Sequence, residues 1–157
     1  MKKQAFVHRN LPRLLLQARE AVMTHTRPSL REHGLSDQQW RVLRVLGEHA
    51  NSKDGAEGVE TGRVAREAFL LGPSLTGVLT RMEEAGWIQR ERMEHDQRRV
   101  KVTVTAATKK LGKSMAPMIE REYLELENKV GVKQLQQVYD ALDTLLQHLD
   151  RPEEISD

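Results

Sequence analysis

The chain has 157 residues, no cysteine, 31% charged residues and a formal net charge of +2, which fits a single domain, 1–157, and excludes disulfides, thiolate metal sites and cysteine redox switches. It has no run of about 18 apolar residues, as a membrane span would need, and its basic N-terminus lacks the apolar core of a signal peptide. We therefore expect a cytoplasmic protein with no membrane contact and, because only 4% of the residues are aromatic, a mainly helical core of Leu, Val, Met and Ala.

A long first helix is predicted within residues 10–34. Asn10 is a favourable N-cap, and leucine, alanine and valine residues follow it at helical spacing. Pro28 should kink or interrupt the helix, because proline lacks the backbone N–H that an interior position donates. Gly34 should end it, because glycine readily takes the left-handed conformation that closes many helices.

Three more helices are predicted next. The first begins in LSDQQWRVLRVLGEH, where Ser36 and Gln39 form a capping box, and a polar loop at residues 51–58 follows it. Thr61 is expected to cap a short helix. Pro73 suits the first turn of the helix after that, because its missing N–H would have no helical partner there. The last two are therefore short helices joined by the tight turn LLGPS.

Two β-strands and two long helices complete the chain. Gly86 should end the preceding helix, and WIQRER and VKVTV then alternate in polarity as two strands do, with MEHDQRR between them. Thr105 is expected to cap a long helix, which Gly131 separates from a last one. Two short helices followed by a hairpin predict a winged helix-turn-helix at residues 36–104, in a mainly α protein with a small β-hairpin wing. Its second short helix can enter a DNA major groove.

Charge is distributed unevenly along the chain. Residues 1–118 carry 21 Lys and Arg against 13 Asp and Glu, whereas residues 119–157 carry 4 against 10. The net charges of the two parts are therefore +8 and −6. A basic body with an acidic C-terminal end indicates a face turned toward a polyanion, although a surface mixed for solubility would give the same numbers.

A specific pattern spans the predicted wing. An Asp-x-Arg element, alternating hydrophobic residues and a hydrophobic-threonine pair follow one another at Asp96-Gln97-Arg98, Val100, Val102 and Val104-Thr105. With RMEEAGWIQRE before it, this pattern resembles the multiple antibiotic resistance regulator (MarR) family, although Val104 stands where leucine is usual. The likeness runs roughly from Leu11 to Leu149. The stretch LLLQAREAVMTHTRPSLREHGLSDQQWRVLRVL is most similar to one subgroup, the repressors of homoprotocatechuate (hydroxyphenylacetate) degradation operons.

The resemblance implies a homodimer. Residues 10–34 and 105–150 would form the dimerisation helices, and a two-fold dimer would match a palindromic operator in double-stranded DNA. The sequence supports this, because these helices carry more apolar residues than one small winged lobe needs. The alternative is that the terminal helices pack only within one chain.

Arginines cluster in the predicted wing. Arg98 and Arg99 lie beside Asp96 at the tip of the predicted hairpin, in a segment too short to bury them. Arginine forks to phosphate and favours the negative potential of a narrow minor groove. The resemblance implies that the aspartate holds the turn while the arginines reach DNA, and Arg90 on the first strand could add a phosphate contact. The alternative is a solvated hairpin with an internal Asp–Arg pair.

The exposed face of the predicted recognition helix combines hydroxyl groups, a glycine and one arginine: Ser74, Thr76, Gly77, Thr80 and Arg81. Hydroxyls and a helix N-terminus suit phosphate contacts, and small residues let a helix seat deeply in a groove. We expect this helix to position the protein more than to read bases. Arg63 and Arg66, on the preceding short helix, are candidate contacts to the DNA backbone. The alternative is a plain surface helix.

A ligand pocket is predicted beside the first helix. His25 falls on the apolar stripe of that helix, with Arg19 at its edge. Arginine can take a carboxylate bidentately and histidine can bond a phenol, which suits a small phenolic carboxylic acid. The same space could be lined by Ser29, His33, Trp40 and Met115. The alternative is that His25 is a core histidine and Arg19 forms a salt bridge.

No motif for catalysis or metal binding appears. The six histidines include no His-x₃-His pair, and no Gly-rich phosphate loop or nucleophile elbow is present. We therefore expect no enzyme, no metal and no cofactor. The predicted function is a DNA-binding repressor of an aromatic-acid catabolic operon, released by a phenolic acid. A regulator of another catabolic or drug-efflux operon, or a protein-interaction module, is the alternative.

Overall fold

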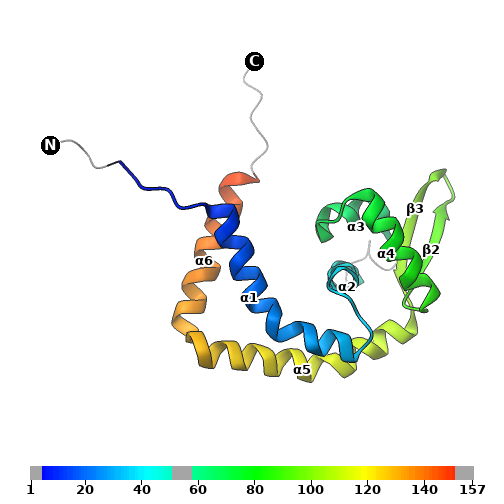
Figure 1. Cartoon of the computed structure of the whole chain (residues 1–157). Helices are drawn as coiled ribbons and strands as arrows, with labels where there is room; N and C mark the ends of the chain where they lie inside the picture. Colours follow the sequence, from blue (N-terminus) through cyan, green and yellow to red (C-terminus); the bar gives the residue numbers. More distant parts are fainter. Residues whose placement is uncertain (1–4, 51–57, 151–157) are drawn as a thin grey trace, which may run out of the picture. The chain divides into compact units, whose positions relative to one another are not determined.

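The computed structural model describes residues 5–50 and 58–150 of the chain. It is mainly helical with one small sheet (Figure 1). The elements, in chain order, are α1 (Leu11–Glu32), α2 (Asp37–Ala50), β1 (Val59–Glu60), α3 (Thr61–Ala68), α4 (Gly72–Glu84), β2 (Ile88–Met93), β3 (Asp96–Val104), α5 (Ala106–Val130) and α6 (Val132–Leu149). Among the helices in these ranges, none has the length and apolar character needed to cross a membrane.

The chain divides into two compact units, Met1–Met118 and Ile119–Asp157, with the boundary inside α5. The first unit holds α1 to α4, the sheet and the beginning of α5, and the second holds the rest of α5 and α6. The boundary coincides with the change from a net charge of +8 to one of −6 along the sequence. The basic unit is therefore the one that contains the helix-turn-helix and its wing.

Two of the predicted helix starts are confirmed in atomic detail. Asn10 caps α1, because its side-chain oxygen accepts the backbone N–H of Arg13 at 3.1 Å. Ser36 and Gln39 form the capping box before α2: the Ser36 hydroxyl accepts the Gln39 N–H at 3.1 Å, and the Gln39 side chain accepts the Ser36 N–H at 3.0 Å. Short-range polar chemistry thus sets both starts.

Three of the predicted helix ends are also confirmed. Gly34, Gly86 and Gly131 follow α1, α4 and α5 with φ values of +71°, +80° and +95°, a conformation that L-residues with a side chain rarely adopt. Pro28 does not interrupt α1, because the helix runs through it to Glu32, and this part of the prediction is wrong.

The core of the first unit lies between α2, α3, α4 and the sheet. Its buried side chains are aliphatic: Leu35, Val42, Leu46, Val59, Val64, Leu75, Val78, Leu79, Met82, Ile88 and Val102. Leu30 from α1 and Met115 from α5 are each only 1% exposed. This core fixes α4 and the sheet as parts of one body, which is what gives the candidate site a defined geometry.

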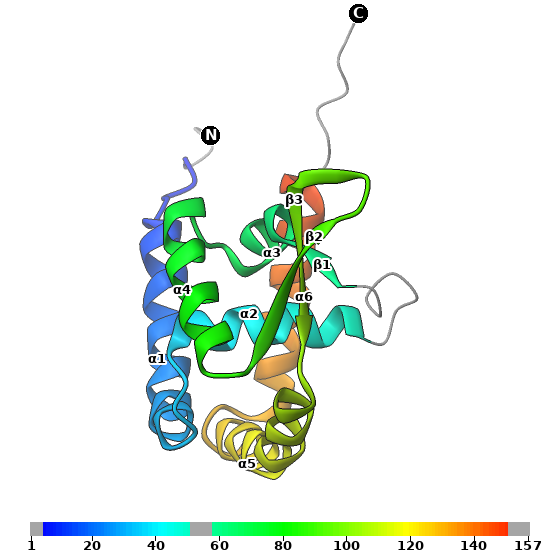
Figure 2. The ribbon, with the colours of Figure 1, turned by 90° about the vertical axis from the view of Figure 1, so that its right-hand side faces the viewer.

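The sheet is antiparallel with strand order β1-β3-β2, so the predicted hairpin of β2 and β3 is confirmed and a third strand is added. Val59 of β1 pairs with Val102 of β3. Because α3 follows β1 directly, Glu60 occupies the N-cap position of α3, and the prediction that Thr61 caps this helix is wrong. Figures 1 and 2 show β2 and β3 as a ribbon whose closing turn lies away from α2.

Many apolar residues of α1 and α6 are exposed in the described chain. Of the α1 residues only Leu30 is buried, and no residue of α6 is. The exposed apolar side chains include Leu11, Leu14, Leu15 and Val22 of α1, and Val138, Tyr139, Leu146 and Leu149 of α6.

Candidate nucleic-acid interface

One face of α4 is buried in the core and the opposite, free face is largely exposed. The buried face holds Leu75, Val78, Leu79 and Met82. The other face carries the five residues that the sequence analysis named: Ser74, Thr76 and Arg81 are exposed, and Gly77 and Thr80 are half-buried. The hydroxyls of Thr76 and Thr80 donate to the carbonyls one turn earlier, at 3.1 and 2.9 Å. The Thr80 oxygen also accepts from Nη2 of Arg90 at 3.5 Å, so of the two oxygens only that of Thr76 keeps both lone pairs for a ligand.

Arg81 lies over Gly77 on this free face. A Cβ atom placed on Gly77 would be 3.4 Å from Nη1 of Arg81, so the glycine leaves room for the guanidinium to lie along the helix. Arg81 has no ion pair among the residues that the structure describes, and its charge is therefore available to an anion.

Arg90 of β2 is tied to Glu83 near the end of α4. Its backbone N–H donates to Oε2 of Glu83 at 3.1 Å, and its guanidinium donates to both carboxylate oxygens at 3.2 and 3.1 Å. The hydrogen bonds from Arg90, with its positive charge, hold the pKa of Glu83 below its usual value. Arg90 therefore fastens the wing to the recognition helix, and its charge is largely compensated.

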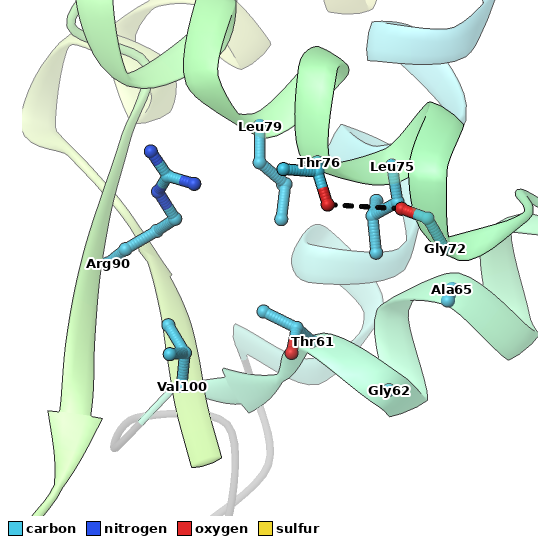
Figure 3. Close-up of a pocket in the computed structure, with 9 residues that line it drawn as sticks. All are labelled: Thr61, Gly62, Ala65, Gly72, Leu75, Thr76, Leu79, Arg90 and Val100. Carbon is cyan, nitrogen blue, oxygen red and sulfur yellow. Dashed lines mark hydrogen bonds between the residues drawn. The ribbon is translucent and has the colours of Figure 1, made fainter. Parts of the chain in front are cut away.

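A cavity of about 320 Å³ lies between α3, α4 and the wing. Figure 3 shows the Arg90 side chain reaching from β2 toward α4, with Val100 of the neighbouring strand β3 beside it and Thr61 of α3 across from α4. The remaining lining residues are Gly62, Ala65, Gly72, Leu75, Thr76 and Leu79. The cavity is an open groove at the predicted DNA-facing side of the lobe.

The turn of the wing is formed by Glu94 and His95, not by the arginines. Arg98 and Arg99 belong to β3 and are not turn residues, so the expectation that they stand at the tip is corrected. They lie in an irregular part of the strand, because Asp96 pairs with Met93 and Val100 pairs with Arg92, which leaves residues 97–99 without partners in β2. Oδ1 of Asp96 accepts the backbone N–H of Arg98 at 3.0 Å, so the aspartate holds the end of the turn. The Arg98 guanidinium makes no hydrogen bond or ion pair with any residue in the described ranges.

Arg99 differs from its neighbour because it is paired with Glu60 of β1. Its Nε donates to Oε1 of Glu60 at 3.0 Å, and its Nη2 donates to Oε2. The hydrogen bonds lower the pKa of Glu60 and raise the pKa of Arg99. Arg99 therefore fastens β3 to the start of α3 and offers less charge to DNA than Arg98 does.

The two arginines of α3 also differ. Nε of Arg63 lies 3.4 Å from Oε2 of Glu67, which His49 of α2 also contacts at 2.7 Å. Arg66 has no ion pair within the described part of the chain. Of the predicted DNA-contacting arginines, Arg66, Arg81 and Arg98 thus form no ion pair among the described residues, one each on α3, α4 and the wing, and Arg66 is still close enough to Glu60 to help lower the pKa of that carboxyl.

A second cavity, of about 300 Å³, lies between α1, α2 and the end of α3. Its lining consists of Arg19, Met23, Asp37, Trp40, Arg41, Arg44, Val45, Glu48, Glu67, Ala68 and Phe69. Of the six residues predicted to bind a ligand, the structure brings Arg19 and Trp40 to this cavity. The other four, namely His25, Ser29, His33 and Met115, do not line it.

These four residues have other surroundings. His25 is exposed, contrary to its expected place on a buried stripe, because nothing in the described chain covers that side of α1. Nδ1 of His33 lies 2.9 Å from the carbonyl oxygen of Ser29, one turn earlier. Met115 is buried.

Three guanidinium groups line the cavity together with Trp40, those of Arg19, Arg41 and Arg44. Nη2 of Arg19 donates to both carboxylate oxygens of Asp37, at 2.9 and 3.0 Å. The guanidinium carbon of Arg44 lies 5.8 Å from the Trp40 ring centroid, within the range of a cation–π contact. Neither Arg44 nor Arg41 forms an ion pair among the described residues, so the cavity offers one paired and two unpaired cations beside an aromatic ring.

The sequence analysis identified the arginines of the candidate interface but not the glutamates that form ion pairs with them. Glu60 and Glu83 hold Arg99 and Arg90, but they lie 39 and 7 positions away from them. A strand of two residues, such as β1, is too short to show a period, so no sequence signal placed Glu60. Arg44 could have been found, because it stands four residues after Trp40 and shares its helix face.

This geometry defines a class of protein. A short helix, a tight turn, a second helix with a polar free face and a β-ribbon fastened to it make a winged helix-turn-helix. The chain belongs to the MarR family: the family model described as MarR family matches residues 33–99. It is 37% identical over 131 residues to the HTH-type transcriptional regulator FarR of Neisseria gonorrhoeae, covering 83% of this chain and 85% of that protein.

Other relatives agree with this assignment. The chain is 34% identical over 140 residues to the homoprotocatechuate degradative operon repressor of Escherichia coli, covering 89% of this chain and 90% of that protein. The crystal structure of transcriptional regulator PA4135 superposes with a TM-score of 0.81 at 38% identity, over 92% of this chain and all of that one. NadR in complex with 4-hydroxyphenylacetate gives a TM-score of 0.72 at 36% identity, over 92% of this chain and 97% of that one. The protein is a MarR-type transcriptional regulator and not an enzyme.

Proposed function

We propose that this protein is a cytoplasmic homodimer that binds a palindromic operator in double-stranded DNA, represses an aromatic-acid catabolic operon and releases the operator when a phenolic acid binds. The observation that carries the DNA-binding part is that three arginines, one each on α3, α4 and the wing of a basic lobe, form no ion pair among the described residues. Phosphate contacts supply much of the affinity for duplex DNA, and an arginine without an ion pair can make one without first giving up another charged partner.

Dimerisation is supported by the uncovered apolar residues of α1 and α6. Leucine, valine and tyrosine side chains recur along α6, and none of its residues is buried. A helix with a strong apolar face buries that face against something in a stable protein. A second copy of the same chain meets this need with two-fold symmetry, and two-fold symmetry matches a palindromic operator.

The effector part of the proposal rests on the cavity that holds Trp40. Its aromatic ring and the Arg44 guanidinium suit a small aromatic acid: the ring packs against a ring, and the cation takes a carboxylate. Two relatives point to the same ligand class, since one is a homoprotocatechuate operon repressor at 34% identity and another is solved with 4-hydroxyphenylacetate at 36% identity. Arg19 is available to the ligand only if it exchanges Asp37 for the ligand carboxylate.

The effector would act by preferring one arrangement of the two winged lobes in the dimer. A ligand shifts such an equilibrium only by its different affinity for the two states. A coupling free energy of about 1–3 kcal/mol would change operator affinity by roughly 5–150-fold. The favoured state would separate or tilt the two recognition helices so that they no longer match successive major grooves.

A regulator of a different operon is the second candidate. One relative, 32% identical over 86% of this chain, is the organic hydroperoxide resistance transcriptional regulator of Bacillus subtilis, so relatives at similar identity differ in the response that their names describe. The chain has no cysteine, which excludes a thiol as its sensor for a peroxide. This difference favours the aromatic-acid effector over hydroperoxides.

Two measurements test the proposal. First, binding to random-sequence duplex DNA is titrated with salt: we expect binding at low salt that falls steeply as salt rises, whereas no binding at low salt would favour a protein-interaction module. Second, thermal-shift measurements are made with phenylacetates, benzoates and cinnamates. A specific binder raises the Tm in proportion to occupancy, and no shift with any of them would reject the effector class.

A further inference from the structure

Arg41 of α2 connects the effector cavity to the helix-turn-helix. It lines the cavity beside Trp40 and Arg44. Its Nη1 donates to the carbonyl oxygens of Ala68 and Phe69, at 3.1 and 3.2 Å, where α3 ends and the turn into α4 begins. The last carbonyls of a helix have no partner within the helix, so this guanidinium caps α3 from outside.

The cap leaves part of the guanidinium unsatisfied. Nε of Arg41 is buried and has no hydrogen-bond acceptor among the described residues. A buried donor without a partner is unfavourable, and more so on a charged group. Arg41 also has no ion pair in the described part of the chain, whereas Arg19 on the other side of the cavity has Asp37. The present arrangement is thus not the best one available to Arg41 once an anion is nearby.

The residue that Arg41 holds is itself in an unfavourable conformation. Phe69 is the only residue other than glycine with positive φ in the described ranges, at +53°, and its side chain is 85% exposed. Side chains rarely occupy the left-handed region without compensation from the surroundings. The hydrogen bond from Arg41 to the Phe69 carbonyl supplies such compensation, so the turn depends on where the guanidinium points.

We propose that Arg41 switches between two partners: the end of α3 when the cavity is empty, and the carboxylate of an aromatic acid when the cavity is filled. In the second state Nε and Nη fork onto the carboxylate, and Ala68 and Phe69 lose their donor. The end of α3 then loosens, and with it the turn that sets the position of α4. This inference rests on the proposed effector function and adds the residue that transmits it.

The test is hydrogen–deuterium exchange of the full-length protein with and without saturating 4-hydroxyphenylacetate, with binding measured separately by calorimetry. The reporter is the end of α3, where the Leu70 N–H donates to the Ala65 carbonyl at 3.0 Å. Wild type, Arg41→Gln and Arg44→Gln are compared. Arg44 is the matched control because it lies on the same helix and lines the same cavity, but donates nothing to α3.

We expect the ligand to speed exchange at the end of α3 in wild type by about fivefold or more. Free Arg41→Gln should already exchange at that faster rate, and saturating ligand should add nothing. Arg44→Gln should bind more weakly yet show the wild-type acceleration once saturated. If Arg41→Gln does not fold by circular dichroism, Arg41→Lys takes its place, because lysine keeps the charge but cannot fork.

The outcomes separate the inference from the proposed function. If the ligand accelerates exchange in Arg41→Gln as it does in wild type, or binds wild type without any change at the end of α3, the inference is overturned and the effector function stands. If neither 4-hydroxyphenylacetate nor benzoate or cinnamate binds wild type at all, the effector function fails and the inference fails with it.

Discussion

Arg90 donates three hydrogen bonds to the Glu83 carboxylate, from its backbone N–H, its Nε and its Nη2, at distances of 3.1 to 3.2 Å. The two residues bracket the turn at Gly86, so the pair closes a short loop between the end of α4 and the start of β2. The recognition helix and the wing are therefore fixed to one another by a charged contact as well as by the core.

This pair should give stability that depends on acid pH. The pKa of Glu83 lies below its ordinary value of 4.5 because of Arg90, so its contribution is present above pH 4.5 and is lost as the pH falls through the lowered pKa. We expect Glu83→Gln to have a lower Tm than wild type at pH 7, by a small amount because the pair is partly exposed. The difference should vanish in strong acid. A Tm difference that persists unchanged below pH 3, roughly where most glutamates are protonated, would contradict the role of the pair.

Arg98→Ala should weaken DNA binding and make the affinity for DNA less dependent on salt concentration. If each copy loses one phosphate contact, the slope of log affinity against log salt should fall by about 0.9 per copy, or about 1.8 for a dimer. Arg99→Ala is the matched comparison: because Arg99 is committed to Glu60, its loss should change the slope less and the Tm more. Equal slopes for wild type and Arg98→Ala would remove the wing from the DNA interface.

Arg19→Ala should leave DNA binding intact and blunt release by an aromatic acid. Losing a charged hydrogen-bond donor should raise the Kd for 4-hydroxyphenylacetate by about tenfold or more, measured by calorimetry. Arg27→Ala is the control, because Arg27 lies on the same helix, pairs with Glu20 and does not line the cavity. Unchanged ligand affinity in Arg19→Ala would leave Arg19 with a purely structural role beside Asp37.

Leu146→Glu should disrupt the dimer. Leu146 belongs to the apolar residues of α6 and is 53% exposed in the single chain, and burying a carboxylate at a dimer interface is costly. Light scattering at micromolar concentration should find monomers or aggregates. Gln147→Glu, at the next position on the same helix, should remain dimeric. A dimer of normal stability for Leu146→Glu would show that α6 does not form the interface.

Met82→Ala should destabilise the first unit by about 2–5 kcal/mol, because a fully buried side chain is replaced by a cavity. Chemical denaturation measures the change. Glu84→Ala, two residues away on an exposed position, should stay within about 0.5 kcal/mol of wild type. A small effect of Met82→Ala would mean that α4 is held by the Arg90–Glu83 pair more than by the core.

The helices were predictable because their signals are local. A capping box spans only four residues, Ser36 to Gln39. A glycine such as Gly86 indicates by itself a position where the backbone can take a positive φ and end a helix. The hairpin followed from alternation over five or six residues in each strand. The winged helix-turn-helix could therefore be assembled from neighbours in the sequence and then confirmed.

The charge partners could not be predicted, because they depend on the tertiary structure. The interpretation of Arg98 and Arg99 as equivalent tip residues failed once β1 brought Glu60 beside one of them. The stripe argument for His25 assumed that α1 is covered on that side, and no described part of the same chain covers it. Periodicity identifies which face of a helix is apolar, but it does not identify what will lie against it.

The two-residue strand β1 has a consequence for how the lobe meets DNA. Glu60 is at once the end of β1, the N-cap residue of α3 and the partner of Arg99, so a strand of the wing and the first helix of the motif share one joint. The Arg90–Glu83 pair joins the wing to α4 on the other side. The helix-turn-helix and the wing are thus preassembled, and they would lose little conformational freedom on binding DNA. In the proposed dimer, the distance between the two copies of this lobe would decide which spacing of half-sites fits.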